Sequence, residues 1–476
     1  MKLRHLFISS VIALSLTSCI TDNSTEASSD TSLLSLEHPI ENIITLNRWD
    51  TLTLAPKVLQ TNQQKKVFYQ WEVNYKVVST APILKYECKE AKTLPCRLKI
   101  TNGDDIRFYT FSVHVQPAYV KGLYILAENG GKTIVSYLPD AESHKKFTFD
   151  ALSKNNPKLD FSGEPVAIAQ AKYAKITSPL LYVAIGNQSK IYEIYQDSMT
   201  VGFTYQPQGK VSFMQYNSAV STPNMIVWLN NKLKTMSMVD VNHKFYDYSD
   251  KWKTGLKHPM QFANERVGWY TPNHRYVHGY AYFDNANGAI ITQSVSNSKI
   301  PLTLLPNTFL GDSLIGMGSL DKELKLALIT LNKGSRQIYF YYVYPGYYTS
   351  KTETTSPAKV IEKHAMPMSS HVGSLSVVRT TSNKSLVFYS NKNAVYAYNV
   401  LSNGNFPTTP WCSVGSASDQ IVDMYVNDEG SLIYIAANSK DAKMPGSIYC
   451  WDINNHKLLW QKQHITGKIK AMVYRK

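Results

Sequence analysis

From Gly122 onward the chain repeats one local pattern: an apolar strand, a short polar turn and a second strand that contains tyrosine or another large apolar residue. The first copy pairs residues 123–126 with 134–137, and the last pairs 432–435 with 448–452. Seven copies begin at residues 123, 181, 226, 276, 326, 386 and 432, so the pattern recurs every 45 to 60 residues. Repeats of this size are typical of β-propeller blades, which are four-stranded sheets that bury their faces against neighbouring blades in a ring. The sequence therefore predicts a seven-bladed β-propeller over residues 118–476.

Two further observations bear on this prediction. Either the strand at 122–127 or the final strand at 468–474 could close the ring. Trp451-Asp452 resembles the dipeptide of WD40 repeats, but it occurs once within residues 118–476, so the region is not a WD40 propeller by motif. A pair of β-sandwiches is the structural alternative, although it would not require seven similar hairpins.

The region before the repeats has a different texture. Residues 36–117 alternate apolar and polar side chains in short runs, at 51–54, 67–73 and 108–115. Such alternation is typical of strands with one buried face, and about eighty residues of short strands favour an immunoglobulin-type β-sandwich. Trp71 is interpreted as a core residue of this sandwich. The fold class expected for the whole chain is all-β.

The first nineteen residues have the form of a bacterial lipoprotein signal. Lys2 and Arg4 precede an apolar stretch at 6–16 that is too short to span a bilayer, and Leu16-Thr17-Ser18-Cys19 matches a lipobox. We expect residues 1–18 to be a cleaved signal peptide and Cys19 to be the lipidation site, where several acyl chains together would anchor the protein stably. The polar segment that follows favours a flexible tether over residues 19–35.

Four cysteines besides Cys19 suit an oxidising compartment and allow two disulfides. Cys88 and Cys96 flank what looks like a hairpin turn at 89–95, so they form one candidate pair. Cys412 with Cys450 is the second candidate, although nothing local brings these two together. The cysteines lack the spacing and histidine partners of a structural zinc site, so no metal is expected.

The chain is basic, with a formal charge of +15 that falls to +13 when Lys2 and Arg4 leave with the signal. A positive field attracts anionic partners such as acidic glycans, lipopolysaccharide or a membrane surface, and it also describes a simply solvated surface. Nucleic acid is not an expected partner of an exported lipoprotein.

No pattern in the sequence identifies a catalytic centre or a cofactor. A nucleophile elbow, a His-Glu-x-x-His pair, a calcium loop and a dinucleotide fingerprint are all absent from the sequence, and no cofactor is expected. His274 and His278 would share one face of a strand and could hold a metal with a third ligand, but packing or surface histidines are the more common case. Acidic residues are scattered singly, so no acid and base pair is predicted.

Two segments are candidates for ligand binding. The first spans residues 251–280 and is both aromatic and basic, and the second follows Pro345-Gly346, which we expect to begin an exposed loop. Aromatic rings can stack on sugar rings or peptide side chains, while cations hold carboxylates or sulfates. Packing between blades is the alternative explanation for both segments. The candidate binding residues are Trp252, Trp269, Tyr270, Arg275, Tyr347 and Tyr348.

The lipobox, the order of the two regions and the strand texture resemble the PKD-like family of Bacteroidetes lipoproteins. Tyr69-Gln70-Trp71-Glu72 stands where a PKD domain has its tryptophan strand, while the glycine-rich half of the PKD signature is absent. The resemblance implies an outer-membrane lipoprotein, on the cell surface or the periplasmic leaflet, that accompanies TonB-dependent uptake systems of the SusC and SusD kind.

Three functional hypotheses follow. The leading one is a non-catalytic protein that binds a nutrient, either a glycan or a peptide, or docks on a TonB-dependent transporter and its SusD-like lipoprotein. The second is a polysaccharide lyase or hydrolase acting on an acidic glycan in the propeller funnel, for which Arg275, His278 and Tyr280 are the compact candidate set. The third is a structural scaffold. Fold analogy alone does not separate them.

Overall fold

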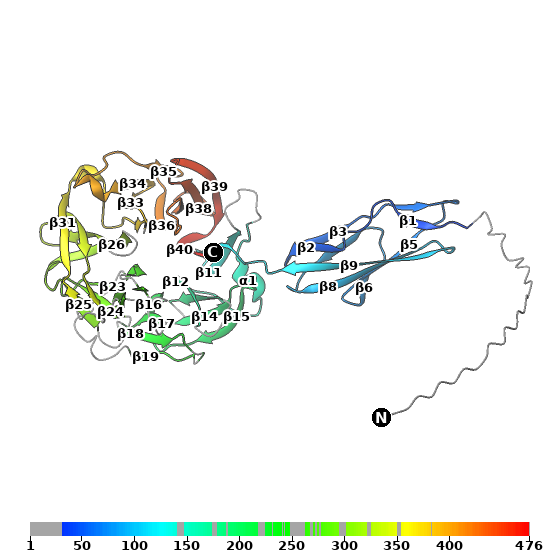
Figure 1. Ribbon diagram of the computed structural model, residues 1–476, viewed down its shortest axis with the longest axis horizontal. Coiled ribbons are helices and arrows are strands. Elements are labelled where there is room, and N and C mark those ends of the chain that lie inside the picture. The colour runs from blue at the N-terminus through cyan, green and yellow to red at the C-terminus, as the bar shows by residue number, and fades with distance from the viewer. Residues whose placement is uncertain are drawn as a thin grey trace, which may run out of the picture. The chain divides into compact units, whose positions relative to one another are not determined.

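The computed structural model describes residues 31–475, apart from 140–146, 174–178, 187–188, 218–223, 231, 240, 242, 248–261, 267–269, 272–273, 276–277, 295–300, 321–324, 350–353 and 382. The chain divides into two compact units, Met1–Ala118 and Tyr119–Lys476. This division lies one residue from the boundary expected from the change in sequence texture. Both units consist almost entirely of strands (Figure 1).

The first unit contains three antiparallel or mixed sheets that share one core. Trp71 is fully buried there, and its Nε1 donates a hydrogen bond to the carbonyl of Ala81 at 2.9 Å. The core draws Leu52 and Leu84 from one sheet and Leu98 from another, so it lies between these two sheets. The prediction that Trp71 is a core residue is confirmed. In hydrogen-bonded order the sheets are β2 (Ile43–Asn47), β9 (Ile106–Gln116), β8 (Thr93–Thr101), β5 (Phe68–Val73) and β6 (Lys76–Ser79); β3 (Thr51–Leu54) with β7 (Leu84–Glu87); and β1 (Leu34–Leu36) with β4 (Val58–Gln60).

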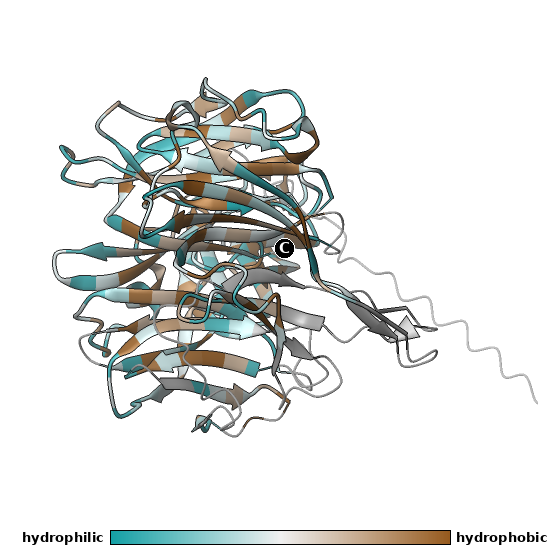
Figure 2. Ribbon diagram, turned by 90° about the vertical axis from the view of Figure 1, so that its left-hand side faces the viewer, coloured by the Kyte–Doolittle hydropathy of each residue, from teal (hydrophilic) through white to brown (hydrophobic). Residues whose placement is uncertain are grey.

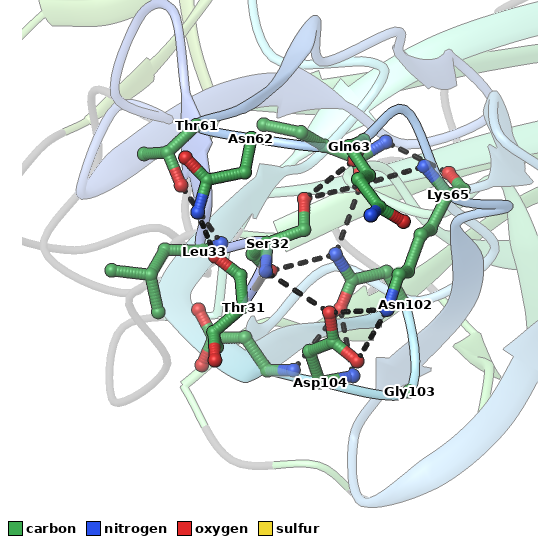
Figure 3. Close-up of polar contacts among 12 residues, drawn as sticks. Thr31, Ser32, Leu33, Thr61, Asn62, Gln63, Lys65, Asn102, Gly103 and Asp104 are labelled. Carbon is green, nitrogen blue, oxygen red and sulfur yellow. Dashed lines mark hydrogen bonds and ion pairs between the residues drawn. The ribbon is translucent and has the colours of Figure 1, made fainter. Parts of the chain in front are cut away.

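The start of the described chain is fastened to this unit by a polar cluster (Figure 3). Ser32 is fully buried, its backbone N–H donates to Asp104 at 3.0 Å, and its hydroxyl donates to the carbonyl of Gln63 at 2.7 Å. Asn102 donates to the carbonyl of Ser32 at 2.8 Å, and Lys65 pairs with Asp104 at 2.6 Å. The expected tether over residues 19–35 is therefore too long, because its last residues belong to the fold.

The second unit contains, within the described residues, six four-stranded sheets and one three-stranded sheet. The seven predicted hairpins are all present as antiparallel strand pairs, each forming the middle or the edge of one of these sheets. The sheets are β11 (Lys132–Pro139), β10 (Gly122–Asn129) and β40 (Lys468–Arg475); β12 (Pro165–Ala171), β13 (Leu180–Ile185), β14 (Lys190–Tyr195) and β15 (Thr200–Tyr205); β16 (Val211–Asn217), β17 (Asn224–Leu229), β18 (Lys232–Ser237) and β19 (Tyr246–Asp247); β20 (Phe262–Arg266), β23 (His278–Asp284), β24 (Ala289–Ser294) and β25 (Pro301–Leu304); β26 (Asp312–Leu320), β27 (Lys325–Asn332), β28 (Ile338–Tyr344) and β31 (Lys359–Met366); β32 (Val378–Thr380), β33 (Leu386–Asn391), β34 (Ala394–Asn399) and β35 (Cys412–Ser413); and β36 (Gln420–Val426), β37 (Leu432–Asn438), β38 (Gly446–Asp452) and β39 (Lys457–Thr466).

These sheets are arranged around a common centre, with one strand of each lying innermost (Figure 1). Neighbouring inner strands contact one another in the pairs β40 and β12, β12 and β16, β20 and β26, β26 and β32, β32 and β36, and β36 and β40. Hydrophobic residues follow the strands, whereas many of the turns between them are hydrophilic (Figure 2). The second unit is therefore propeller-like, as the repeat length predicted.

The first and last strands of the second unit pair with each other. β10 and β40 are antiparallel neighbours, with Leu123 opposite Tyr474 and Ile125 opposite Met472. Both candidates for the closing strand, at 122–127 and at 468–474, therefore lie in the same sheet. A short helix, α1 (Ala151–Asn155), packs against β11 beside this closure.

The candidate disulfides are not formed. Cys88, Cys96 and Cys412 are buried free thiols, and Cys450 is buried and likewise outside any disulfide. Residues 88–92 connect β7 to β8, and these strands belong to different sheets, so the segment between Cys88 and Cys96 is not the turn of a hairpin. Cys412 and Cys450 lie in separate core clusters, so burial does not bring that pair together.

Candidate functional site

The structure places part of the predicted aromatic and basic segment in a small hairpin. β21 (Tyr270–Thr271) and β22 (His274–Arg275) form a two-stranded sheet in which Tyr270 lies directly opposite Arg275. This hairpin is inserted between β20 and β23, so it is an addition to a four-stranded sheet. Trp252 and Trp269 lie outside the described residues.

Tyr347 and Tyr348 begin a strand, so the expectation of an exposed loop after Pro345-Gly346 is wrong. β29 (Tyr347–Thr349) pairs with β30 (Thr354–Ser356), placing Tyr347 opposite Ser356 and Tyr348 opposite Thr355. Gly346 has a φ of +75°, which ends β28 and turns the chain into this second inserted hairpin. The sequence signal for a turn was correct, but the turn leads into a hairpin.

The two inserted hairpins come together. β22 contacts β29, although 73 positions of sequence separate His274 from Tyr347, where the second hairpin begins. Their parent sheets are neighbours, because β20 contacts β26. The structure thus brings the segment of Tyr270 and Arg275 beside the segment of Tyr347 and Tyr348, a proximity that neither segment alone predicts.

The prediction that His274 and His278 share one face of a strand is wrong. His274 lies on β22 and His278 begins β23, and these strands belong to different sheets, so the two residues do not lie on one strand. Arg275 and Tyr280 are divided in the same way. Within the described residues no group of three metal-binding side chains comes together.

The centre of the second unit holds a cavity of about 420 Å³ lined by β12, β16, β32, β36 and β40. Arg379 and Asp423 face it and form an ion pair of 2.5 Å. Asp423 also accepts from the backbone N–H groups of Met424 at 2.8 Å and Met472 at 2.9 Å. A carboxylate so fully occupied holds strands together, and the candidate lyase residues do not line the described part of this cavity.

A buried cluster of one glutamate and three tyrosines lies where the sheet of β12–β15 meets the sheet of β16–β19. The sequence did not predict it. Glu193 on β14 is 4% exposed, and its Oε2 accepts hydrogen bonds from the hydroxyls of Tyr182 and Tyr205, both at 2.7 Å. Tyr173 donates to the same oxygen at 3.2 Å. Burial raises the pKa of all three tyrosines, so their hydroxyls remain protonated donors.

The cluster reaches solvent through His243. Its Nδ1 lies 2.9 Å from the Tyr205 hydroxyl and 3.5 Å from Glu193 Oε2. Its ring stacks on that of Phe203, with 4.0 Å between the ring centroids. His243 and Phe203 line a cavity of about 490 Å³. We name this depression the His243 cavity; it is lined by Phe203, Thr204, Tyr205, Gln206, Pro207, Gln208, Leu229, Lys234, His243 and Phe245. The one sequence signal for it was an acid inside the otherwise apolar run Ile191-Tyr192-Glu193-Ile194.

No helix in the described residues is long and apolar enough to cross a membrane. No family model matches the chain, and no curated protein matches it. The resemblance to PKD-like lipoproteins therefore has no support from family models.

Several solved structures are similar in fold. A quinoprotein alcohol dehydrogenase-like protein from Bacteroides thetaiotaomicron has a TM-score of 0.48 at 12% identity, over 91% of this chain and 97% of that one. The dihydro-haem d1 dehydrogenase NirN has a TM-score of 0.39 at 9% identity, over 74% and 75%. The β-propeller domain of Cps50 (Swd1) from Myceliophteria thermophila has a TM-score of 0.38 at 9% identity, over 65% and 91%. At these identities and TM-scores the similarities assign neither a family nor an activity to this chain.

Proposed function

We propose that this protein is a non-catalytic outer-membrane lipoprotein, anchored through Cys19, that binds a nutrient or docks on a TonB-dependent uptake system. In this proposal residues 1–18 are a cleaved signal, and the first unit is an immunoglobulin-type spacer of the PKD-like kind. The second unit is a seven-bladed propeller that carries the binding face. The nutrient is a glycan or a peptide.

The contact between β22 and β29 carries this proposal. Both hairpins are additions to four-stranded sheets, and additions to a rigid scaffold are where binding residues concentrate. Their strands bear Tyr270 and Arg275 on one hairpin and Tyr347 and Tyr348 on the other. Tyrosine and arginine are residue types that suit a ligand with ring faces and acidic or polar groups.

The anchor is tested by comparing wild-type protein with Cys19→Ser in the native host. We expect wild type in the outer-membrane fraction and the variant released or unprocessed, because a serine cannot carry the thioether lipid. An outer-membrane location that is unchanged in Cys19→Ser would contradict lipid anchoring at this residue.

The partner is tested by cross-linking the lipidated protein in its own outer membrane and identifying what is recovered with it. Recovery of a TonB-dependent transporter supports docking. In parallel, glycan and peptide arrays are probed with the full mature chain. Failure to bind glycans, peptides or any membrane partner would reject the proposal.

The binding face is tested with Arg275→Ala and with the double variant Tyr347→Ala, Tyr348→Ala. We expect each to weaken binding by about tenfold or more, as residues at the centre of an interface do. Tyr195→Ala is the matched control, because Tyr195 is 53% exposed and lies on β14, in another sheet. Binding that the hairpin variants leave intact would move the ligand site elsewhere on the chain.

A further inference from the structure

The His243 cavity contains a histidine whose Nδ1 has a defined hydrogen-bond partner, the hydroxyl of Tyr205. Glu193 Oε2 and the Tyr205 hydroxyl are 2.7 Å apart, a separation that requires a proton between the two oxygens. Burial raises the pKa of Tyr205, so its hydroxyl stays protonated and donates this proton to Glu193. The Tyr205 oxygen is then left to accept, and the hydrogen bond from His243 Nδ1 at 2.9 Å fills that role.

This order of donors assigns the tautomer of His243. With its proton on Nδ1, the neutral ring carries a lone pair on Nε2. The described residues supply no hydrogen-bond partner for Nε2, and the His243 side chain is 28% exposed. Nε2 is therefore the acceptor that the cavity offers to a ligand.

The titratable groups that face His243 are Glu193, Tyr205 and Lys234. Glu193 accepts hydrogen bonds from three phenol hydroxyls. Tyr205 is buried, and burial raises its pKa, so its hydroxyl stays a protonated donor. Lys234 lines the cavity and adds positive charge there.

The rest of the lining supplies apolar ring faces and amides. Phe203 is 38% exposed and stacks on His243, and Phe245 packs against Tyr205 at the same site. Gln206 and Gln208 are exposed at the rim. A volume of about 490 Å³ lies within the range of small-molecule sites. Ring faces beside a few hydrogen-bonding groups match a pyranose, which has an apolar face and hydroxyls around its edge.

We propose that the His243 cavity binds one neutral pyranose unit of a saccharide, with a sugar hydroxyl donating to His243 Nε2 and the sugar's apolar face lying against Phe203 or Phe245. This site is separate from the two inserted hairpins. It uses different residues, so it stands or falls independently of the binding face proposed above.

The test is saturation-transfer NMR on the full mature chain with methyl α-glucoside, methyl β-galactoside and methyl α-mannoside as neutral probes and methyl glucuronide as the anionic one. We expect saturation transfer to at least one neutral glycoside. Phe203→Ala and His243→Ala should each weaken that binding by about tenfold or more. Phe149→Ala is the matched control, because Phe149 is 42% exposed in the same unit and does not line the cavity.

His243 contacts the buried Tyr205, so a change at His243 can disturb the fold as well as the site. Phe203 is partly exposed, so Phe203→Ala tests the site even if a change at His243 disturbs the fold.

Three outcomes would overturn the proposal. The first is that no neutral glycoside binds. The second is binding that survives both Phe203→Ala and His243→Ala. The third is a preference for methyl glucuronide over all three neutral glycosides, which would mean that the cavity holds an anion.

Discussion

Arg379 on β32 and Asp423 on β36 form an ion pair of 2.5 Å at the centre of the second unit. Arg379 Nε also donates to the carbonyl of Met424 at 2.7 Å, and Asp423 accepts from the backbone of Met472 on β40 at 2.9 Å. One carboxylate thus connects three inner strands. The last of them, β40, pairs with the first strand of the unit, so the connection bears on how the first and last strands are held together.

Replacing this carboxylate should destabilise the second unit. In Asp423→Ala the guanidinium of Arg379 loses its charged partner, and the buried N–H of Met472 loses its acceptor. We expect a loss of about 2–4 kcal/mol in the free energy of unfolding, measured by denaturant titration of the full mature chain. Glu37→Ala removes the exposed pair with Lys57 and should cost less than about 1 kcal/mol. Equal effects from the two variants would contradict a structural role for Asp423.

Gly467 should be required for the pairing of β10 with β40, because a larger residue would clash there. A Cβ at this position would lie 2.1 Å from the carbonyl oxygen of Glu128 on β10, which cannot move without disturbing the sheet. Gly467→Ala should therefore destabilise the unit by about 1–3 kcal/mol. In Gly373→Ala the new Cβ meets nothing within 4 Å, so this variant should unfold like wild type. A Gly467→Ala variant as stable as wild type would show that β40 can shift at no cost.

The core of the first unit should depend on the indole of Trp71. Trp71→Phe keeps a ring in the core but leaves the carbonyl of Ala81 without its 2.9 Å hydrogen bond and opens a small cavity. We expect a loss of about 1–3 kcal/mol in denaturant unfolding. Tyr75→Ala is the control, because Tyr75 is 84% exposed, and it should change stability by less than about 0.5 kcal/mol. Unchanged stability in Trp71→Phe would count against this account of the core.

The hairpins could be predicted from the sequence because their signal is local. Each combines an apolar run, a turn and a second strand within about twenty residues, and strand pairing across a short turn needs no other part of the chain. The same local reasoning failed after Gly346, where a correctly placed turn leads into β29. A turn signal marks where a strand ends, but it does not say whether another strand follows.

The polar clusters could not be predicted because their members come from distant segments. Asp423 meets Arg379 across 44 positions of sequence, and Glu193 meets His243 across 50. Such contacts depend on which sheets become neighbours in the ring. A single glutamate in an apolar strand signals that a partner exists, since a buried charge requires one, but it does not identify that partner.

The burial of the cysteines predicts how readily their thiols react. Burial raises the pKa of the Cys96 thiol to about 11 and that of Cys412 to about 12, so both are protonated at about pH 8. Because the thiolate is the reactive form, native protein should be alkylated slowly by iodoacetamide at these positions, as mass spectrometry would show. In denaturant without reductant, Cys88, Cys96, Cys412 and Cys450 should all react, since none is in a disulfide.

The same pKa shifts fix the sign of a pH effect on stability. A buried thiol with a raised pKa stays protonated in the folded state while the thiol of the unfolded chain ionises, so above about pH 8.5 the folded state binds more protons than the unfolded chain. Stability should therefore be insensitive to these thiols near neutral pH and should fall as the pH rises past that value. Cys412→Ser, whose hydroxyl does not ionise there, should show a shallower alkaline decline in denaturant unfolding than wild type. If a cysteine in the denatured sample resists alkylation until reductant is added, it had been oxidised in the exported protein. Such a cysteine would then contribute nothing to the loss of stability at alkaline pH.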